Sequence, residues 1–251
     1  MPYTTSFATD AGTYAKKNSK PNEDAAHAFS KDGVGYQLIS DGNGSVNDMK
    51  PAGFIVNEIS RYIDRFSIPN MSAEQVKELI SQACYCANRV LMAYKRANEE
   101  LYTSNNFATL TMSAITQNNE FVFAHCGDCR LYIIRDDRIT QFSKDHTLAQ
   151  KLCDEGKLTK EEVFSHPDNG VLYSALGFPE PRIDAMVGRV KKGDILLAVT
   201  DGIHKALDVN QIMSVVNEAG NCEDTCDGLI QYVNSLGGMD NMAVTVTYIT
   251  E

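Results

Sequence analysis

The chain has 251 residues, a net charge of −10 and 43% hydrophobic residues. This hydrophobic fraction can build a large core, and no Pro-, Ser- or Gly-rich linker interrupts the sequence, so we expect a single domain over residues 1–251. The acidic balance excludes a nucleic-acid backbone as the main ligand, and no apolar run approaches the roughly 20 residues that cross a bilayer. Neither nucleic acid nor a membrane is therefore an expected partner.

The cysteines indicate the redox compartment. They number seven, which is odd, they are scattered through the chain, and no apolar signal segment stands at the N-terminus. Reduced thiols in a cytoplasm fit this pattern better than a disulfide framework, so we expect a cytoplasmic protein. The alternative is a zinc site made by Cys126, Cys129, Cys222 and Cys226, because the first pair has C-x-x-C spacing.

The first part of the chain predicts a strand, a basic turn and a hairpin. We expect the strands at Tyr3–Thr9, up to Phe29 and at Val34–Ser40, the basic turn at Lys16–Lys20 and the hairpin turn at Lys31–Gly33. Glu23 and Asp24 precede the second strand, and Asp41 follows the third. Because the two strands pair antiparallel, these ends lie side by side and bring two or three carboxylates together. A solvated acidic loop is the alternative for Glu23 and Asp24 taken singly.

Asp41 stands in the stretch GYQLISDGNG, where glycines let the backbone approach whatever the carboxylate holds. Asp-Gly after an apolar run is usually a hairpin turn. However, the pattern recurs at Gly127-Asp128, at Asp201-Gly202 and at Gly238-Met239-Asp240-Asn241. Four aspartates at strand ends predict a carboxylate cluster that holds hard divalent cations.

The rest of the chain alternates between helix pairs and short strands. We expect helices at Pro51–Phe66, about Ser72–Leu101, Thr147–Glu155, Val209–Asn217 and Glu223–Asn234, and strands at Thr109–Thr116, Phe121–Cys126, Leu131–Ile134, Ile139–Phe142, Ile183–Val190, Asp194–Thr200 and Met242–Thr250. Gly156–Gly177 has weak periodicity, so residues 145–177 read as a flap-like excursion near the site. The order of elements predicts an α+β fold, a four-layer α-β-β-α sandwich with two antiparallel sheets face to face and helix pairs outside.

The motifs resemble those of one family. They occur in the order and at the spacing found in the metal-dependent protein phosphatases of type 2C, the PPM-type serine/threonine phosphatases, in a bacterial-like single-domain form: Asn22-Glu23-Asp24, Asp41-Gly42-x-Gly44, Gly127-Asp128-x-Arg130, Asp145-His146, Leu176-Gly177, Asp201-Gly202-Ile203 and Gly238-x-Asp240-Asn241. No single motif is decisive, but together they cover nearly the whole chain and are highly specific. The β-sandwich of that family agrees with the order of elements.

The resemblance implies metal ligands. Asp41 would bridge two Mn²⁺ or Mg²⁺ ions, with the Gly42 carbonyl on the second ion. Asp201 and Asp240 would complete the first ion, and Glu23 would serve the second, with Asp24 close behind. Asp128 would lie near a third, weaker ion, and Asn241 would support Asp240. Asp41, Asp201 and Asp240 are thus the implied catalytic residues, acting through a hydroxide that two ions share and align with phosphorus.

Three positions depart from the family pattern. Ser19 stands where the family usually places an arginine for the substrate phosphate, which leaves Lys16 and Lys20 as candidates for that contact. Asn43 replaces a histidine proposed as the general acid, so a metal-bound water would protonate the leaving group. Lys205 replaces an aspartate that helps to hold the third ion, which leaves two ions as the expected cofactors.

The implied function is hydrolysis of phosphoserine and phosphothreonine in proteins, with a cognate serine/threonine kinase as the expected partner. One alternative is an inactive or weak relative that binds phosphoproteins or regulates a kinase. Another is a phosphatase for a small phosphorylated metabolite. Asp145-His146 is expected to be structural beside the flap, and His204 is expected to face solvent.

Overall fold

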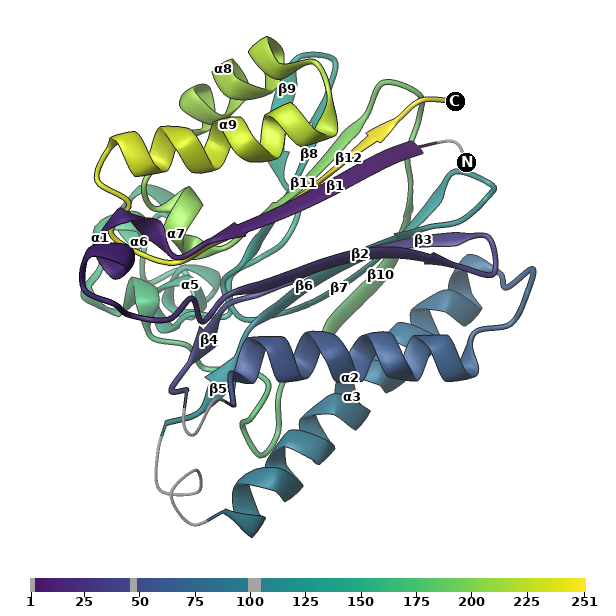
Figure 1. Cartoon of the computed structure of the whole chain (residues 1–251), viewed down its shortest axis with the longest axis horizontal. Helices are drawn as coiled ribbons and strands as arrows, with labels where there is room; N and C mark the ends of the chain where they lie inside the picture. Colours follow the sequence, from purple (N-terminus) through teal and green to yellow (C-terminus); the bar gives the residue numbers. More distant parts are fainter. Residues whose placement is uncertain (1–2, 46–48, 99–104) are drawn as a thin grey trace.

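The computed structural model describes residues 3–45, 49–98 and 105–251, and it consists of two antiparallel sheets packed face to face (Figure 1). One sheet has the strand order β1-β12-β11-β8-β9. Its strands are β1 (Tyr3–Asp10), β12 (Met242–Ile249), β11 (Ile195–Val199), β8 (Arg130–Arg135) and β9 (Arg138–Gln141). The other sheet has the order β10-β7-β6-β3-β2. Its strands are β10 (Asp184–Arg189), β7 (Glu120–Cys126), β6 (Leu110–Ile115), β3 (Val34–Ser40) and β2 (Ala25–Lys31).

Helix pairs cover the outer faces of both sheets. Figure 1 shows α8 (Val209–Ala219) and α9 (Cys222–Ser235) over the first sheet, and α2 (Pro51–Phe66) and α3 (Ala73–Ala97) beneath the second. α3 begins with a capping box, in which Ser72 and Gln75 satisfy each other's backbone N–H groups. The predicted α+β sandwich is confirmed.

The strands form because their side chains are buried on both faces. On β3, Tyr36 and Leu38 pack against the helices α2 and α3, whereas Ile39 packs between the sheets. Phe121 and Phe123 fill the same layer between the sheets from β7. A strand that is covered on both faces reads as a continuous apolar run, which is why β3 is recognisable in the sequence.

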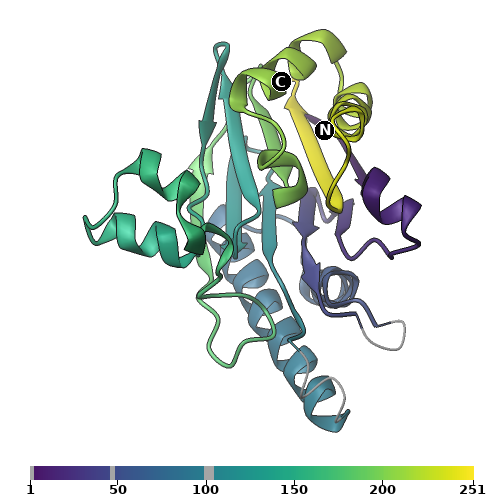
Figure 2. The same ribbon diagram turned by 90° about the vertical axis from the view of Figure 1, so that its left-hand side faces the viewer.

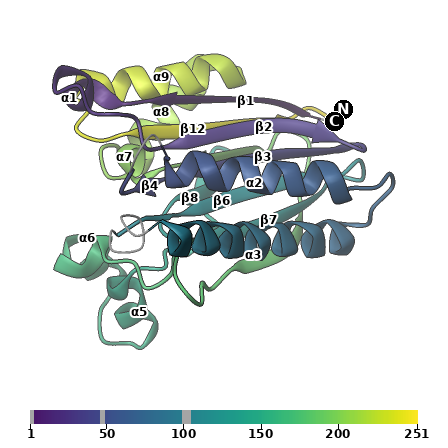
Figure 3. The ribbon, with the colours of Figure 1, turned by 60° about the horizontal axis from the view of Figure 1, so that its bottom comes forward.

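The chain termini and the loops that matter here lie at opposite ends of the sandwich. Figure 3 shows both termini at one end, and α1 (Gly12–Lys17), β4 (Gly42–Asn43) and α7 (Asp201–His204) at the other. β4 pairs with β5 (Phe107–Ala108) to form a small separate ribbon. All four strand-end aspartates follow or precede strands at this second end.

The excursion after β9 projects from one side of the sandwich, as Figure 2 shows. The expectation of an irregular segment over Gly156–Gly177 was wrong in part, because α6 (Lys160–Ser165) and a 3-10 turn (Pro167–Gly170) follow α5 (Leu148–Asp154). α6 carries a capping box between Thr159 and Glu162, a signal that is visible in the sequence.

Other expectations need correction. Lys16 and Lys17 end the helix α1, so the basic turn at Lys16–Lys20 is shorter than predicted. α7 and the β4–β5 ribbon were not predicted, and the predicted end of the long helix at Leu101 lies outside the described residues.

The four cysteines do not form one site, which rules out the zinc alternative. Cys126 lies in the core under α2 and α3, while Cys222 and Cys226 lie in the core under α8 and α9. Within the described part of the chain, no helix is both long and apolar enough to span a bilayer.

Candidate active site

One cavity at the loop end of the sandwich gathers the acidic side chains. Its volume is about 240 Å³. It is lined by Glu23, Asp41, Gly42, Asn43, Phe107, Asp128, Gly170, Leu172, Asp201, Lys205, Asp240 and Asn241. Larger cavities of about 710 and 540 Å³ lie elsewhere, but each is lined by a single carboxylate. The smaller cavity carries the titratable groups, and it is therefore the candidate site.

The β2–β3 hairpin places Glu23 beside Asp41, as predicted. Ala25 pairs with Ser40, so the residues just before β2 face the residue just after β3. The Glu23 carboxylate accepts a hydrogen bond from the Ser45 backbone N–H at 2.7 Å, which fixes it at the mouth of the hairpin.

Asp41 is held by its backbone. Its N–H donates to Thr109 Oγ1 at 2.9 Å, and its carbonyl accepts from the Thr109 N–H at 2.8 Å. The neighbouring residue has to be glycine, because a Cβ at Gly42 would lie 2.7 Å from the Glu23 carbonyl oxygen and 3.0 Å from the Ala52 Cβ. Glycine therefore lets the chain after Asp41 pack closely against the Glu23 segment and α2, while Asp41 lines the cavity.

Asp201 and Asp240 arrive from the other sheet. Asp201 begins α7 directly after β11, and Asp240 precedes β12, the strand that pairs with β11. A Cβ at Gly202 would lie 1.9 Å from the Asn241 carbonyl oxygen, so glycine is required where the two segments cross. Asn241 also joins the two sheets, since its Oδ1 accepts from the Glu23 N–H at 2.8 Å and its Nδ2 donates to the Ala11 carbonyl at 2.9 Å.

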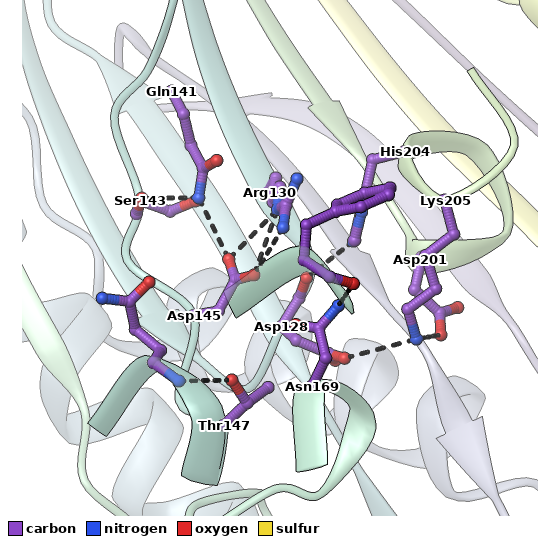
Figure 4. A network of polar contacts seen from close by, with 12 residues as sticks. Asp128, Arg130, Gln141, Ser143, Asp145, Thr147, Asn169, Asp201, His204 and Lys205 are labelled. Carbon is purple, nitrogen blue, oxygen red and sulfur yellow. Dashed lines mark hydrogen bonds and ion pairs between the residues drawn. The ribbon is translucent and has the colours of Figure 1, made fainter. Parts of the chain in front are cut away.

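Asp128 lies in the turn between β7 and β8, where its buried side chain lines the cavity, and Figure 4 shows it near Asp201 and Lys205. His204 Nε2 donates to the Asp128 carbonyl oxygen at 3.0 Å, so His204 is buried and the expectation that it faces solvent was wrong. Arg130 is committed to Asp145, with its Nη2 2.8 Å from the Asp145 Oδ2. These contacts hold the turn in place without neutralising the Asp128 carboxylate.

The carboxylates disfavour each other's charge. Burial, together with the charges of Asp201 and Asp240, raises the pKa of Asp24 to about 8. Burial and the charge of Asp201 raise the pKa of Asp128 to about 7, and they raise the pKa of Asp240 as well. Burial, then the neighbouring aspartates, raise the pKa of Asp41 well above its usual value. The site therefore gathers more carboxyl groups than it can keep ionised near neutral pH without bound cations.

A lysine supplies one positive charge. Lys205 Nζ lies 2.6 Å from Asp201 Oδ2 and 3.9 Å from Asp128 Oδ2 (Figure 4). Burial lowers the pKa of Lys205, but the charges of Asp201 and Asp128 outweigh it and raise that pKa, so the ammonium stays charged.

The donor set suits hard divalent ions. In the described ranges, no three His, Cys, Asp or Glu side chains already form a coordination group. Mg²⁺ does not need one, because it keeps several waters and takes only one or two carboxylates. The acidic donors are all oxygens, and Asp24 Oδ2 is buried without a hydrogen-bond partner. The residues therefore fit ions of the Mg²⁺ and Mn²⁺ type.

The comparison with known families decides the identity. The sequence profile described as protein phosphatase 2C matches residues 11–236. The chain belongs to the protein phosphatase 2C family. This confirms the resemblance drawn from the motifs and the prediction of a protein phosphatase.

Two relatives from bacteria are similar over almost the whole chain. The serine/threonine phosphatase stp of Listeria innocua is 26% identical over 244 residues, which cover 95% of this chain and 92% of that protein. The structure of the S. agalactiae serine/threonine phosphatase is 25% identical and covers 98% of this chain and 99% of that one, with a TM-score of 0.87. A second structure and third similar protein, the catalytic domain of the serine/threonine protein phosphatase PstP in complex with two manganese ions, is 22% identical over 99% of both chains and has a TM-score of 0.79. That third similarity supports the fold.

Not all predicted residues reach the cavity. Lys16 pairs with Asp10 at 2.5 Å and Lys20 lies over the Tyr14 ring, so neither lines it. Asn43 lines the cavity, but its Nδ2 donates to the Asn105 carbonyl at 2.6 Å.

His146 bridges Gly127 and Asp184, in keeping with a structural role beside the flap. The role of Thr109, whose hydroxyl anchors Asp41, could not be predicted, because a threonine beside a strand carries no distinguishing sequence pattern.

Proposed function

We propose that this chain hydrolyses phosphoserine and phosphothreonine in proteins, with two Mn²⁺ or Mg²⁺ ions as cofactors. The observation that carries the proposal is the convergence of Glu23, Asp41, Asp201 and Asp240 on one small cavity. The PstP structure with two manganese ions supports the ion count, because it shares the fold.

The proposed ligand roles follow the position of each carboxylate. Asp41, whose carboxyl interacts with those of Asp201, Asp24 and Asp128, would serve both ions, and the Gly42 carbonyl would serve the second. Asp201 and Asp240 lie at the ends of the adjacent strands β11 and β12 and would hold the first ion, while Glu23 lies across the β2–β3 hairpin from Asp41 and would hold the second. Asp24 is buried behind Glu23 and would lie close to the second ion. Asp128 would remain beneath Asp201.

When bound, two such ions supply a nucleophile by lowering the pKa of water, and they neutralise charge on the phosphoryl oxygens. The residues of the chain hold the proposed metal ligands in position and close the cavity around the substrate. Asn241 ties the Glu23 segment to Asp240, so the two halves of the site keep a fixed separation. Leu172 and Gly170 from the excursion close one side of the cavity, so the excursion is the segment that would select among substrates.

A second candidate function has one observation in its favour. The Lys205 ammonium lies against Asp201, a proposed metal ligand, and a cation there could take the place of a metal ion. A chain that binds no metal would act as a phosphoprotein-binding or kinase-regulating module. Metal binding in solution separates the two functions.

The proposed setting is a cytoplasm, with a serine/threonine kinase as the partner that phosphorylates the substrates. All seven cysteines are free thiols, as expected in a reducing compartment.

The test is hydrolysis of a phosphothreonine peptide with Mn²⁺, with EDTA, and with Mn²⁺ on Asp201→Asn. Asp137→Asn, at an exposed turn with a positive φ that asparagine tolerates, is the matched control. We expect turnover that needs metal, disappears in Asp201→Asn and persists in Asp137→Asn. A panel of small phosphorylated metabolites tests in parallel the alternative that the chain is a metabolite phosphatase. Metal-independent turnover, or faster turnover of a metabolite than of any phosphopeptide, would overturn the proposal.

A further inference from the structure

Lys205 is the one positively charged side chain among the described residues that line the cavity. It follows α7 directly, four residues after Asp201, and its Nζ lies 2.6 Å from Asp201 Oδ2 and 3.9 Å from Asp128 Oδ2. The side chain of Lys205 is 42% exposed, whereas those of Asp201 and Asp128 are 17% and 6% exposed. The ammonium thus lies between two more deeply buried carboxylates (Figure 4).

The other positive groups near Asp128 are committed elsewhere. Arg130 donates from Nε and Nη2 to Asp145, which is as deeply buried as Asp128. The pKa of His204 is lowered to about 4 by burial and by the charge of Arg130, so its ring is neutral, and it donates to the Asp128 backbone rather than to the carboxylate. Within the described ranges, Lys205 is the only cation that forms an ion pair with Asp128.

We propose that the Lys205 ammonium is a built-in cation of the active site, which fills the position between Asp128 and Asp201 that would otherwise recruit a metal ion. This inference rests on the proposed function, since it concerns the number of ions that the site binds. Reversal of the charge at residue 205 would add a carboxylate to the two that already face this position. The chain would then bind one ion more than it does with lysine.

The short distance to Asp201 allows a different interpretation, which the test has to separate. If the ammonium only competed for Asp201 with the first ion, removal of the charge would tighten metal binding without adding an ion. If it fills a position of its own, removal of the charge without a new carboxylate would leave the first two ions at similar affinity.

The experiment counts Mn²⁺ ions bound per chain, by calorimetric titration and by elemental analysis after gel filtration. The variants are Lys205→Asp, Lys205→Met and the control Lys192→Asp, which makes the same charge change on an exposed turn lysine. We expect two ions in the wild type and in Lys192→Asp, and three in Lys205→Met and Lys205→Asp, with the third ion bound more tightly in Lys205→Asp, where a further carboxylate faces it. Three ions in the wild type, or two in Lys205→Asp, would overturn the inference while leaving the metal-dependent function intact.

Two further outcomes are informative. A Lys205→Met variant that binds two ions at least about tenfold more tightly than the wild type would replace the inference with competition at Asp201. A wild-type chain that binds no Mn²⁺ would overturn the proposed function and this inference with it.

A measurement without metal keeps the inference testable if Lys205→Asp does not fold. In EDTA, Lys205→Met leaves Asp128 without its cation, so we expect its Tm to fall by about 2–4 °C. In an Asp128→Asn background, the same Lys205→Met change should lower Tm by less, because only the Asp201 carboxylate still pairs with the ammonium. Equal falls in both backgrounds would show that Lys205 acts only on Asp201 or only through packing, and would overturn the inference.

Discussion

Asp194 and Asp128 are both buried aspartates near the ends of strands, but their surroundings are opposite. The Asp194 carboxylate accepts from Arg135 Nε at 2.8 Å, from Arg135 Nη2 at 2.6 Å and from the Lys191 N–H at 2.7 Å. Asp128 has one cation at 3.9 Å and three acidic neighbours. Asp194, whose carboxylate has its hydrogen bonds satisfied, holds two loops together. Asp128, which we call unsaturated because its carboxylate lacks such donors, belongs to a cluster that is costly to bury.

Asp145 extends the comparison into the active-site end. It accepts from Arg130 Nε and Nη2 and from Gln141 Nε2, although it lies close to Asp128 (Figure 4). Proximity to the cavity therefore does not make a carboxylate functional. What marks a functional carboxylate is the absence of strong hydrogen-bond donors around it. Such a carboxylate is costly to bury, and a cation bound from solution compensates its charge when the site is in use.

The largest expected effect comes from replacing one aspartate of each kind by asparagine. Asp41→Asn should lower kcat/KM for a phosphopeptide at least about a thousandfold, since a two-ion site contributes several kcal/mol of charge stabilisation and each 1.36 kcal/mol is tenfold. Asp194→Asn should retain Mn²⁺ affinity but lose about 2 kcal/mol of unfolding free energy, because hydrogen bonds to a charged partner are lost. Steady-state kinetics and urea unfolding of both variants check this crossover. Normal kinetics in Asp41→Asn would break the comparison.

Asn241 tests whether the two halves of the site are held by neutral side chains. Asn241→Ala removes the acceptor for the Glu23 N–H and the donor to the Ala11 carbonyl. We expect Mn²⁺ affinity to fall about tenfold, the lower range for groups that orient metal ligands. Calorimetric titration measures this, and Asn217→Ala on the exposed surface of α8 is the matched control. Equal affinities in the two variants would refute the positioning role of Asn241.

The pH dependence of the unfolding free energy, measured in EDTA, reports the raised pKa values of the unsaturated carboxylates directly. The pKa values of Asp24 and Asp128, about 8 and about 7 when folded against 3.8 in the unfolded chain, mean that the folded state keeps protons that the unfolded state has released. Their contribution to stability is complete below the unfolded pKa and is lost as pH rises through the folded values.

The pKa of both His125 and His204 is lowered to about 4. Their effect on the pH dependence of the unfolding free energy has the opposite sign, and it changes little above the unfolded histidine pKa of 6.5. Between about pH 7 and 8.5 we therefore expect the unfolding free energy to fall by up to about 1.4 kcal/mol per pH unit for each retained proton. Urea unfolding with EDTA measures the slope, and Asp24→Asn should flatten it while Asp137→Asn does not. A slope that rises with pH would contradict the account.

The smallest expected effect concerns the lysines outside the cavity. Lys20 is exposed and lies over the Tyr14 ring, with its Nζ 5.1 Å from the ring centroid. An exposed charge contributes up to about 1 kcal/mol, so Lys20→Ala should raise KM at most about fivefold and leave kcat unchanged. Lys192→Ala is the control. A loss in kcat would place Lys20 much nearer to the reacting phosphate than its position here suggests.

Local geometry explains what could be predicted from the sequence. A hairpin fixes its own register, so the apposition of Glu23 and Asp41 followed from two strands and a turn. The helix stripes of α2 and α3 and the continuous apolar run of β3 fixed the layers in the same way.

Tertiary contacts explain what could not. α1 has only six residues and no side-chain N-cap, and it is held by a hydrogen bond from the Tyr14 N–H to the Gly238 carbonyl, 224 residues further along. The burial of His204 depends on the β7–β8 turn, which no pattern around His204 indicates. Lys205 is different, because its i, i+4 spacing from Asp201 is visible in the sequence, and only the one-turn helix α7 that makes the spacing meaningful was missed.

The most direct test of the central claim is the thermal unfolding of Asp41→Asn in EDTA. If the cluster is built for cations rather than for stability, Asp41→Asn removes an ionisable group that is costly to bury and that repels Asp201, Asp24 and Asp128 when ionised. We predict a Tm higher than that of the wild type by about 2–4 °C, together with loss of Mn²⁺ binding. A lower Tm would mean that Asp41 stabilises the fold as Asp194 does, and that the distinction between the two kinds of aspartate is wrong.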